Sequence, residues 1–260
     1  HGRRHMPVVD MDGRLAGLLS VHDALAAADA QLMRQIDRLT HEGTLEGLRE
    51  VKAAQVELAW DLFADKLPAP EIQQLLPRIN NDIYRRLGEA TLAQMAQEGW
   101  GEIPVPGCAI VMGSGGRGES FLFPDQDNGI IIADYPDERH GQIDAFYREL
   151  AERLCRALDA VGIPYCNGYC MAVNPLWRKS LCQWSEQIAL WGRKSNFVAI
   201  RLADIFFDFQ PVWGRHDLAA ELRRRITGIV RNNHHFLRQM FQDKLGHNVA
   251  LGFFGGFVTE

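Results

Sequence analysis

Apolar residues at helical spacing dominate the first hundred residues that follow a short N-terminal segment. Residues 25–40, 44–67 and 70–99 each repeat apolar side chains every three or four positions, as one face of a helix requires. Prolines separate the second helix from the third, and Pro77 predicts a break or a kink early in the third. The pattern therefore predicts a helical bundle that packs on the rest of the chain.

The N-terminal segment has the pattern of a β-hairpin. Two apolar runs, Met6–Val9 and Leu15–Leu19, flank Asp12-Gly13, which is a typical two-residue turn. Asp23 then fits the N-cap of a following helix.

From residue 109 onward, short apolar runs alternate with amphipathic stretches, which predicts an α+β domain. The expected strands are 109–112, 129–133 and 166–172, and the expected helices are 142–161 and 181–191. A long helix is expected from 217 to 245, where a glycine would end it. His234 and His235 are adjacent on that helix and face different directions, so we expect surface residues rather than metal ligands.

The segment 113–134, with the sequence GSGGRGESFLFPDQDNGIIIAD, carries the candidate chemistry. Its glycines let backbone N–H groups approach phosphate oxygens, while Ser114 and Arg117 add a hydroxyl and a positive charge. Asp125 and Asp127 are two residues apart at an expected strand start, so both point to one face and can share Mg²⁺. A solvated turn is the alternative for Asp-Gln-Asp-Asn alone, and the preceding glycines favour the metal and phosphate site.

Two other phosphate-binding motifs are excluded. Gly113, Gly115 and Gly118 match the spacing of the dinucleotide-binding fingerprint, but that fingerprint needs a helix after the turn, which Pro124 would break. No Lys-Ser or Lys-Thr follows the glycines, which excludes a Walker-type loop.

The segment resembles the signature of the DNA polymerase beta-type nucleotidyltransferase superfamily, in which glycine-serine precedes an Asp-x-Asp pair. Its Gly-Arg-Gly-Glu centre is similar to that of PII uridylyltransferases and glutamine synthetase adenylyltransferases. Together with Asp-Gln-Asp-Asn, it resembles the nucleotidyltransferase domain found downstream of CBS pairs in bacterial signalling proteins. Further matches at 162–164, 171–178 and 206–214 extend the resemblance over roughly 91–217.

The resemblance implies a mixed-sheet nucleotidyltransferase core at residues 101–215. A helical bundle at 27–100 would precede this core, and the start of a helical substrate-binding region at 216–260 would follow it. The same resemblance implies that Asp125 and Asp127 hold Mg²⁺ or Mn²⁺. The residues implied to bind the nucleotide phosphates, or to support the carboxylates beside them, are Gly113, Ser114, Arg117 and Asn128. For Arg117, an ion pair with Glu119 is the structural alternative.

A third carboxylate is the point at which the chain departs from this superfamily. Most active members carry it on a later strand, and residues 169–174 contain neither Asp nor Glu. Asp204 and Asp208 are the nearest later substitutes, and we assign Asp208 to the catalytic set, with helix capping as its alternative role.

Residues 1–26 resemble the C-terminal part of a CBS motif. The letters from Gly17 to Asp23 match that family's ligand signature, which implies that Ser20 meets the phosphate and Asp23 the ribose of an adenosine nucleotide. Because a CBS site needs paired motifs, we expect this ligand only in a longer protein, of which this chain is a piece.

Composition and charge limit the classes of partner that the chain is expected to bind. A formal charge of −5, with no basic block beyond residues 223–225, gives no indication of nucleic-acid binding, and no apolar run approaches the ~20 residues of a membrane span. The five cysteines are scattered, and Cys166 and Cys170 lack a second pair or a nearby histidine, so we expect free thiols in a reducing cytoplasm. A homodimer is compatible with the sequence.

Two classes of function follow. One is an enzyme that moves a nucleoside monophosphate from an NTP to a hydroxyl of a protein or small molecule under CBS control. The other is a catalytically weak nucleotide sensor, which would bind an NTP without turnover.

Overall fold

The computed structural model describes residues 5–9, 14–20, 43–64 and 66–245. At the N-terminus, β1 (His5–Val9) pairs antiparallel with β2 (Leu15–Ser20), and His5 lies opposite Ser20. The predicted hairpin is therefore confirmed. Asp23 and the helix expected at 25–40 lie outside the described residues.

A four-stranded mixed sheet forms the centre of the fold, in the order β5-β4-β3-β6. β3 pairs antiparallel with both β4 and β6, whereas β4 and β5 run parallel. The two strands predicted on either side of the glycine turn are confirmed as β3 and β4. The bounds are β3 (Gly107–Val111), β4 (Asn128–Ile132), β5 (Arg178–Ser180) and β6 (Gln210–Gly214).

The strand predicted at 166–172 is wrong. These residues form turns, and the neighbouring Tyr165 makes only an isolated bridge to Gln126. Asn167-Gly168 favours a turn, and Tyr169 takes a left-handed φ of 56°, which an extended strand does not allow. The parallel neighbour of β4 is instead β5.

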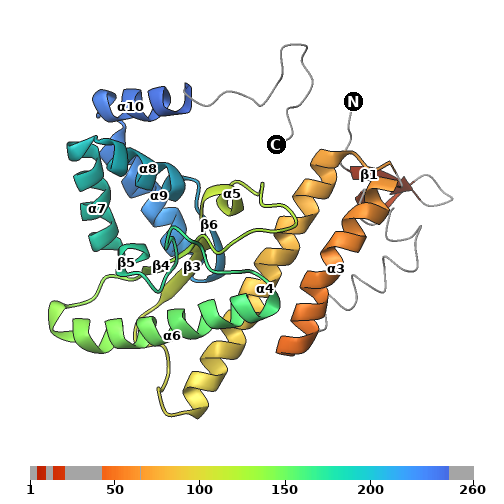
Figure 1. Ribbon diagram of the computed structural model, residues 1–260, viewed down its shortest axis with the longest axis horizontal. Helices are drawn as coiled ribbons and strands as arrows, with labels where there is room; N and C mark the ends of the chain where they lie inside the picture. Colours follow the sequence, from red (N-terminus) through yellow and green to blue (C-terminus); the bar gives the residue numbers. More distant parts are fainter. Residues whose placement is uncertain (1–4, 10–13, 21–42, 65, 246–260) are drawn as a thin grey trace.

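The two faces of the sheet are covered by separate helical layers (Figure 1). Alternate side chains of β3 and β4 belong to different clusters, with Ile110 and Ile131 in one and Val111 and Ile130 in the others. The first face packs against α7 (Leu181–Lys194), α8 (Phe197–Phe207) and α9 (His216–Val230). The second packs against α3 (Leu45–Ala64), α4 (Ala69–Gln97) and α6 (His140–Val161). Both faces are therefore buried, as the continuous apolar runs of these strands require.

The predicted helices at 44–67 and 70–99 are confirmed as α3 and α4. Pro68 precedes α4 and Pro70 lies in its first turn, where the missing N–H costs no helical hydrogen bond. The helix continues through Pro77, so the predicted break is absent. Apolar side chains of α4 join the core that the sheet forms with α3 and α6.

The single long helix predicted from 217 to 245 is wrong. The chain forms α9 and then α10 (His234–Leu245), with Asn233 between them. The Asn233 side-chain oxygen accepts a hydrogen bond from the N–H of Phe236, and its amide donates to the Gly192 carbonyl at the end of α7. This side chain caps the start of α10, which favours a new helix over continuation of the old one.

The glycine turn folds as one short helix, α5 (Gly113–Gly116), directly after β3. A Cβ added to Gly116 would overlap the backbone carbonyl of Asp208 at the end of α8. Glycine is thus required at this position by a close approach of two backbones.

Gly116→Ala is expected to destabilise the protein by at least about 2 kcal/mol, because a rigid backbone cannot yield as a flexible side chain would. Gly141→Ala in α6 is the matched control, since a Cβ there meets nothing within 4 Å, and it should stabilise by up to about 1 kcal/mol. Urea denaturation measures both changes. Equal stability of the two variants would contradict the close approach.

Candidate functional site

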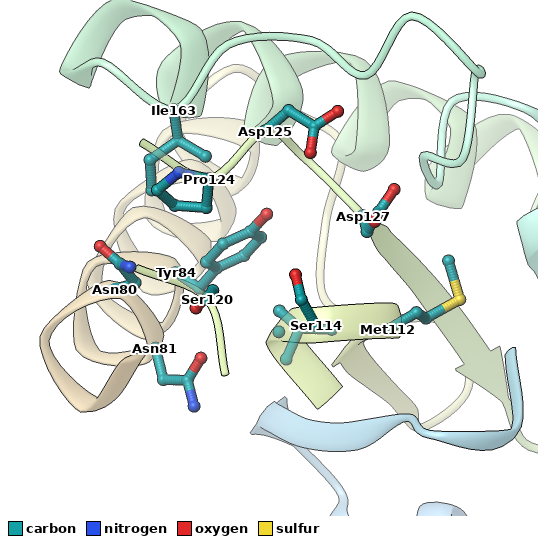
Figure 2. Close-up of a pocket in the computed structure, with 12 residues that line it drawn as sticks. Asn80, Asn81, Tyr84, Met112, Ser114, Ser120, Pro124, Asp125, Asp127 and Ile163 are labelled. Atoms are coloured by element: carbon teal, nitrogen blue, oxygen red, sulfur yellow. The ribbon is translucent and has the colours of Figure 1, made fainter. Parts of the chain in front are cut away.

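A pocket lies where β3 ends, between α5, α4 and the loop that enters β4 (Figure 2). The carboxylates of Asp125 and Asp127 and the hydroxyl of Ser114 point into the same space, with the Tyr84 ring across from them. The lining residues are Asn80, Asn81, Tyr84, Val111, Met112, Ser114, Gly115, Ser120, Pro124, Asp125, Asp127 and Ile163. The structure therefore brings the predicted aspartate pair and part of the predicted glycine turn together.

The glycine turn lies directly against Asp127. Gly113 has a left-handed φ of 53°, and a Cβ added there would lie 3.2 Å from Asp127 Oδ2. The Met112 N–H donates to the Asp127 carbonyl at 2.9 Å, which ties the start of the turn to the residue before β4. The turn can therefore place backbone N–H groups and the Ser114 hydroxyl beside a carboxylate, as binding of a metal–phosphate group requires.

The two aspartates form a site of high negative potential. Burial and then the charge of Asp125 raise the pKa of Asp127 to about 6. Carboxylate and hydroxyl oxygens are the donors that hard divalent cations prefer, and a cation between the carboxylates would relieve their repulsion. The residues present therefore fit Mg²⁺ or Mn²⁺.

Buried amides on either side of Asp127 hold the segment in place. The Gln126 side chain donates to the carbonyls of Cys155 and Ile163, both at 2.9 Å. The Asn128 Oδ1 accepts from the Ala172 N–H at 2.9 Å, and its Nδ2 donates to the Tyr84 hydroxyl at 3.4 Å. Asn128 is buried and does not line the pocket, so its place favours support of the aspartates over direct contact with a nucleotide.

Arg117 and Asp208 form a group of their own at the edge of α5. The Arg117 guanidinium donates to Glu119 at 2.6 Å and to Asp208 at 2.8 Å. The Arg117 side chain stays 40% exposed, and neither it nor Asp208 lines the pocket. The ion pair with Glu119 is therefore present, and the roles predicted for Arg117 and Asp208 at the nucleotide and the metal stay predictions.

Sequence reasoning missed the contribution of α4, which supplies Asn80, Asn81 and Tyr84 to the pocket. Buried Lys52 donates to Gln55 at 2.7 Å, and Gln55 donates to Asn80 Oδ1 at 2.9 Å. This relay fixes the Asn80 amide and leaves its buried Nδ2 without a hydrogen-bond partner among the described residues. Lys52, Gln55 and Asn80 interrupt the apolar faces of α3 and α4, and these polar positions could have indicated the contribution of the helices to the pocket.

Among the described residues no cysteine forms a disulfide, and Cys108, Cys155 and Cys170 are buried. Burial raises the pKa of the Cys170 thiol to about 12, and burial also raises that of Cys166. Cys166 and Cys170 nevertheless lie beside Asp127, which sequence spacing alone could not indicate.

Asp127→Asn is expected to stabilise the metal-free protein at pH 7.5 by roughly 1 kcal/mol, after allowance for partial exposure. The folded state raises this pKa to about 6 from 3.8, so ionisation costs stability as pH rises through that interval. The gain in melting temperature over the wild type should accordingly vanish near pH 4. Thermal melts in a chelator at both pH values measure it, and a variant less stable than the wild type at pH 7.5 would contradict it.

Among the described residues, no helix is long and apolar enough to cross a membrane. A search of curated proteins found no match. A family model described as "Putative nucleotidyltransferase DUF294" matches residues 53–197, a range that includes most of α3, all of α4, the glycine turn, both aspartates and α7. The mixed sheet with helices on both faces is consistent with a nucleotidyltransferase-like fold. Because the match covers more than half of the 260 residues, the chain belongs to this nucleotidyltransferase family.

Proposed function

We propose that the protein transfers a nucleoside monophosphate from an NTP to a hydroxyl group, with pyrophosphate as the leaving product. The observation that carries the proposal is the convergence of Asp125, Asp127 and Ser114 on one pocket beside a glycine turn. Membership of the family suggests the same reaction type. The acceptor is a protein or a small molecule, as in the uridylyl- and adenylyltransferases that the motif resembles.

Each pocket residue has a separate task in this reaction. Asp125 and Asp127 hold a divalent cation, which supplies charge neutralisation of the phosphates and orients the attacking oxygen. Ser114 and the backbone N–H groups of the glycine turn bind the outer phosphates. The Asn80 Oδ1 accepts from Gln55, and its Nδ2, which has no partner among the described residues, donates to an acceptor atom of the base or ribose.

A nucleotide sensor is the second candidate, and one observation favours it. Asp125 and Asp127 are the only carboxylates that line the pocket in the described part of the chain. With a complete CBS pair, an adenosine nucleotide bound through Ser20 and Asp23 would control either activity. Pyrophosphate release that depends on Mg²⁺ separates the candidates, because a sensor binds NTP without turnover.

Asp125→Asn and Asp127→Asn should each lower turnover by about 10²-fold or more, the scale seen when a preorganised charge is lost. Asp137→Asn, on the exposed η1 (Asp137–Arg139), removes the same charge outside the pocket and should leave turnover unchanged. Pyrophosphate release with each of the four NTPs measures the effect, and mass spectrometry of candidate acceptors identifies the product. Wild-type turnover in either pocket variant would rule out the metal assignment.

The Arg117–Asp208 pair can be tested as a unit. If Arg117 binds phosphate and Asp208 orients it, Arg117→Ala should weaken NTP binding by about 1.5–3 kcal/mol, and Asp208→Asn should weaken it in the same direction. If Asp208 serves the metal, Asp208→Asn should cut turnover and leave NTP affinity largely intact. Calorimetric titration with NTP and with the nucleoside, beside turnover assays, distinguishes these results. Equal losses for NTP and nucleoside would show that Arg117 is structural.

A further inference from the structure

A cluster of one carboxylate and two thiols lies beside the pocket. An oxygen of Asp127 and the sulfur atoms of Cys166 and Cys170 all lie within 4.8 Å of one another. The carboxylate comes from the residue before β4, and the thiols come from the turn that replaces the predicted strand at 166–172. The two cysteines therefore do have a partner, although it lies far from them in sequence.

Backbone hydrogen bonds hold the segment that carries Asp127 against the turn that carries the two cysteines. The Gln126 N–H donates to the Pro164 carbonyl, and the Asn128 N–H donates to the Cys170 carbonyl, both at 2.9 Å. These bonds lie on either side of Asp127 and fix its position against the turn. Two backbone hydrogen bonds therefore fix the arrangement, in which Cys170 is buried and Asp127 and Cys166 are half-buried.

One backbone donor of the turn points at the sulfur of Cys166. The Gly168 N–H donates to its sulfur at 3.3 Å, a contact that stabilises a thiolate more than a thiol. Asp125 lies two residues before Asp127 and lines the same pocket, so a further carboxylate is available as a fourth donor.

We propose that Asp127, Cys166 and Cys170 bind a thiophilic divalent cation, Zn²⁺, with Asp125 or a water molecule as the fourth ligand. Two sulfur and two oxygen donors suit tetrahedral Zn²⁺, whereas Mg²⁺ requires six oxygen ligands. With Zn–S bonds of about 2.3 Å, donor atoms stand roughly 3.5–3.8 Å apart, so the observed cluster needs to contract by only about 1 Å. Binding exchanges two thiol protons for two Zn–S bonds, and both protons pass to solvent.

Asp127 belongs both to this cluster and to the pocket, so Zn²⁺ binding should affect the proposed activity. Zn²⁺ bound to Asp127 withdraws a carboxylate oxygen and negative charge from the hard cation of the pocket, so Zn²⁺ inhibits nucleotidyl transfer. The inhibitory effect rests on the proposed function, whereas Zn²⁺ binding itself does not.

Binding is tested first, without any turnover assay. The full chain, kept reduced with a phosphine, is titrated with Co²⁺, whose bonds to thiolates give an intense near-ultraviolet charge-transfer band. Zn²⁺ should then displace Co²⁺ at a ratio of one ion per chain. Competition against a chromophoric chelator should give an affinity for Zn²⁺ at least about 100-fold higher than that for Mg²⁺.

Variants locate the site. Cys166→Ser with Cys170→Ser should abolish the band and weaken Zn²⁺ binding by at least about 100-fold. Cys166→Ser alone, at a half-buried position, should weaken it substantially and guards against a folding defect in the double variant. Cys182→Ser is the matched control, because Cys182 is exposed and lies on α7 outside the cluster. A band that is absent from the wild type, or that persists in the double variant, would overturn the proposal.

Inhibition is tested second. Wild-type turnover in Mg²⁺ should fall as Zn²⁺ fills the site, and the double-cysteine variant should need at least about 100-fold more Zn²⁺ for the same fractional loss. Equal sensitivity of the two proteins would overturn the inhibitory role and leave the binding result standing. If the protein shows no turnover at all, the proposed function fails, and the Co²⁺ and Zn²⁺ titrations still decide whether the metal site exists.

Discussion

The site depends on two buried amides, Gln126 and Asn128, that hold the start of β4 against the segment after α6. Their side chains and backbone groups bond to Cys155, Ile163, Pro164, Cys170 and Ala172. Without these bonds the irregular segment 163–172 would have buried backbone groups without partners, at a cost of about 1–3 kcal/mol each. Because Asp125 and Asp127 alternate with these amides, the interaction that anchors the segment also places both carboxylates.

Because amides and aspartates alternate, the segment can satisfy its buried hydrogen bonds and still present carboxylates to the pocket. The even-numbered amides satisfy the interior, and the odd-numbered aspartates face the pocket with their repulsion unrelieved. The fold therefore tolerates an electrostatic cost at Asp127 because neighbouring residues secure the backbone on both sides. A cation recovers that cost when it binds, so part of its affinity originates in folding.

The sequence was sufficient to predict those elements that depend on the spacing of neighbouring residues. The hairpin, the two N-terminal helices and strands β3 and β4 follow from apolar periodicity, and the glycine turn lies beside Asp127 because only the short loop 117–126 connects them. Other features depend on contacts between distant residues. The segment 166–172 looked like a strand because it is apolar, but its Asn-Gly turn prevails and β5 takes the place beside β4. The break before α10 depends on an amide that reaches α7, and the Arg117–Asp208 pair joins residues 91 positions apart.

The place of Asn80 and Tyr84 on α4 limits how the pocket can change over evolution. One turn after Tyr84, the same helix carries Gly88, and a Cβ there would lie 2.9 Å from the Trp213 ring of β6. The wall formed by α4 is therefore part of the hydrophobic core, and a substitution that widens the pocket on this side also disturbs the edge of the sheet. The loop before Asp125 is held at Leu122, whose carbonyl accepts from Lys52 at 2.9 Å, but its Phe123 is 84% exposed. Substitutions at Phe123 can accordingly alter the pocket entrance without disturbing the core, whereas substitutions on the α4 side cannot.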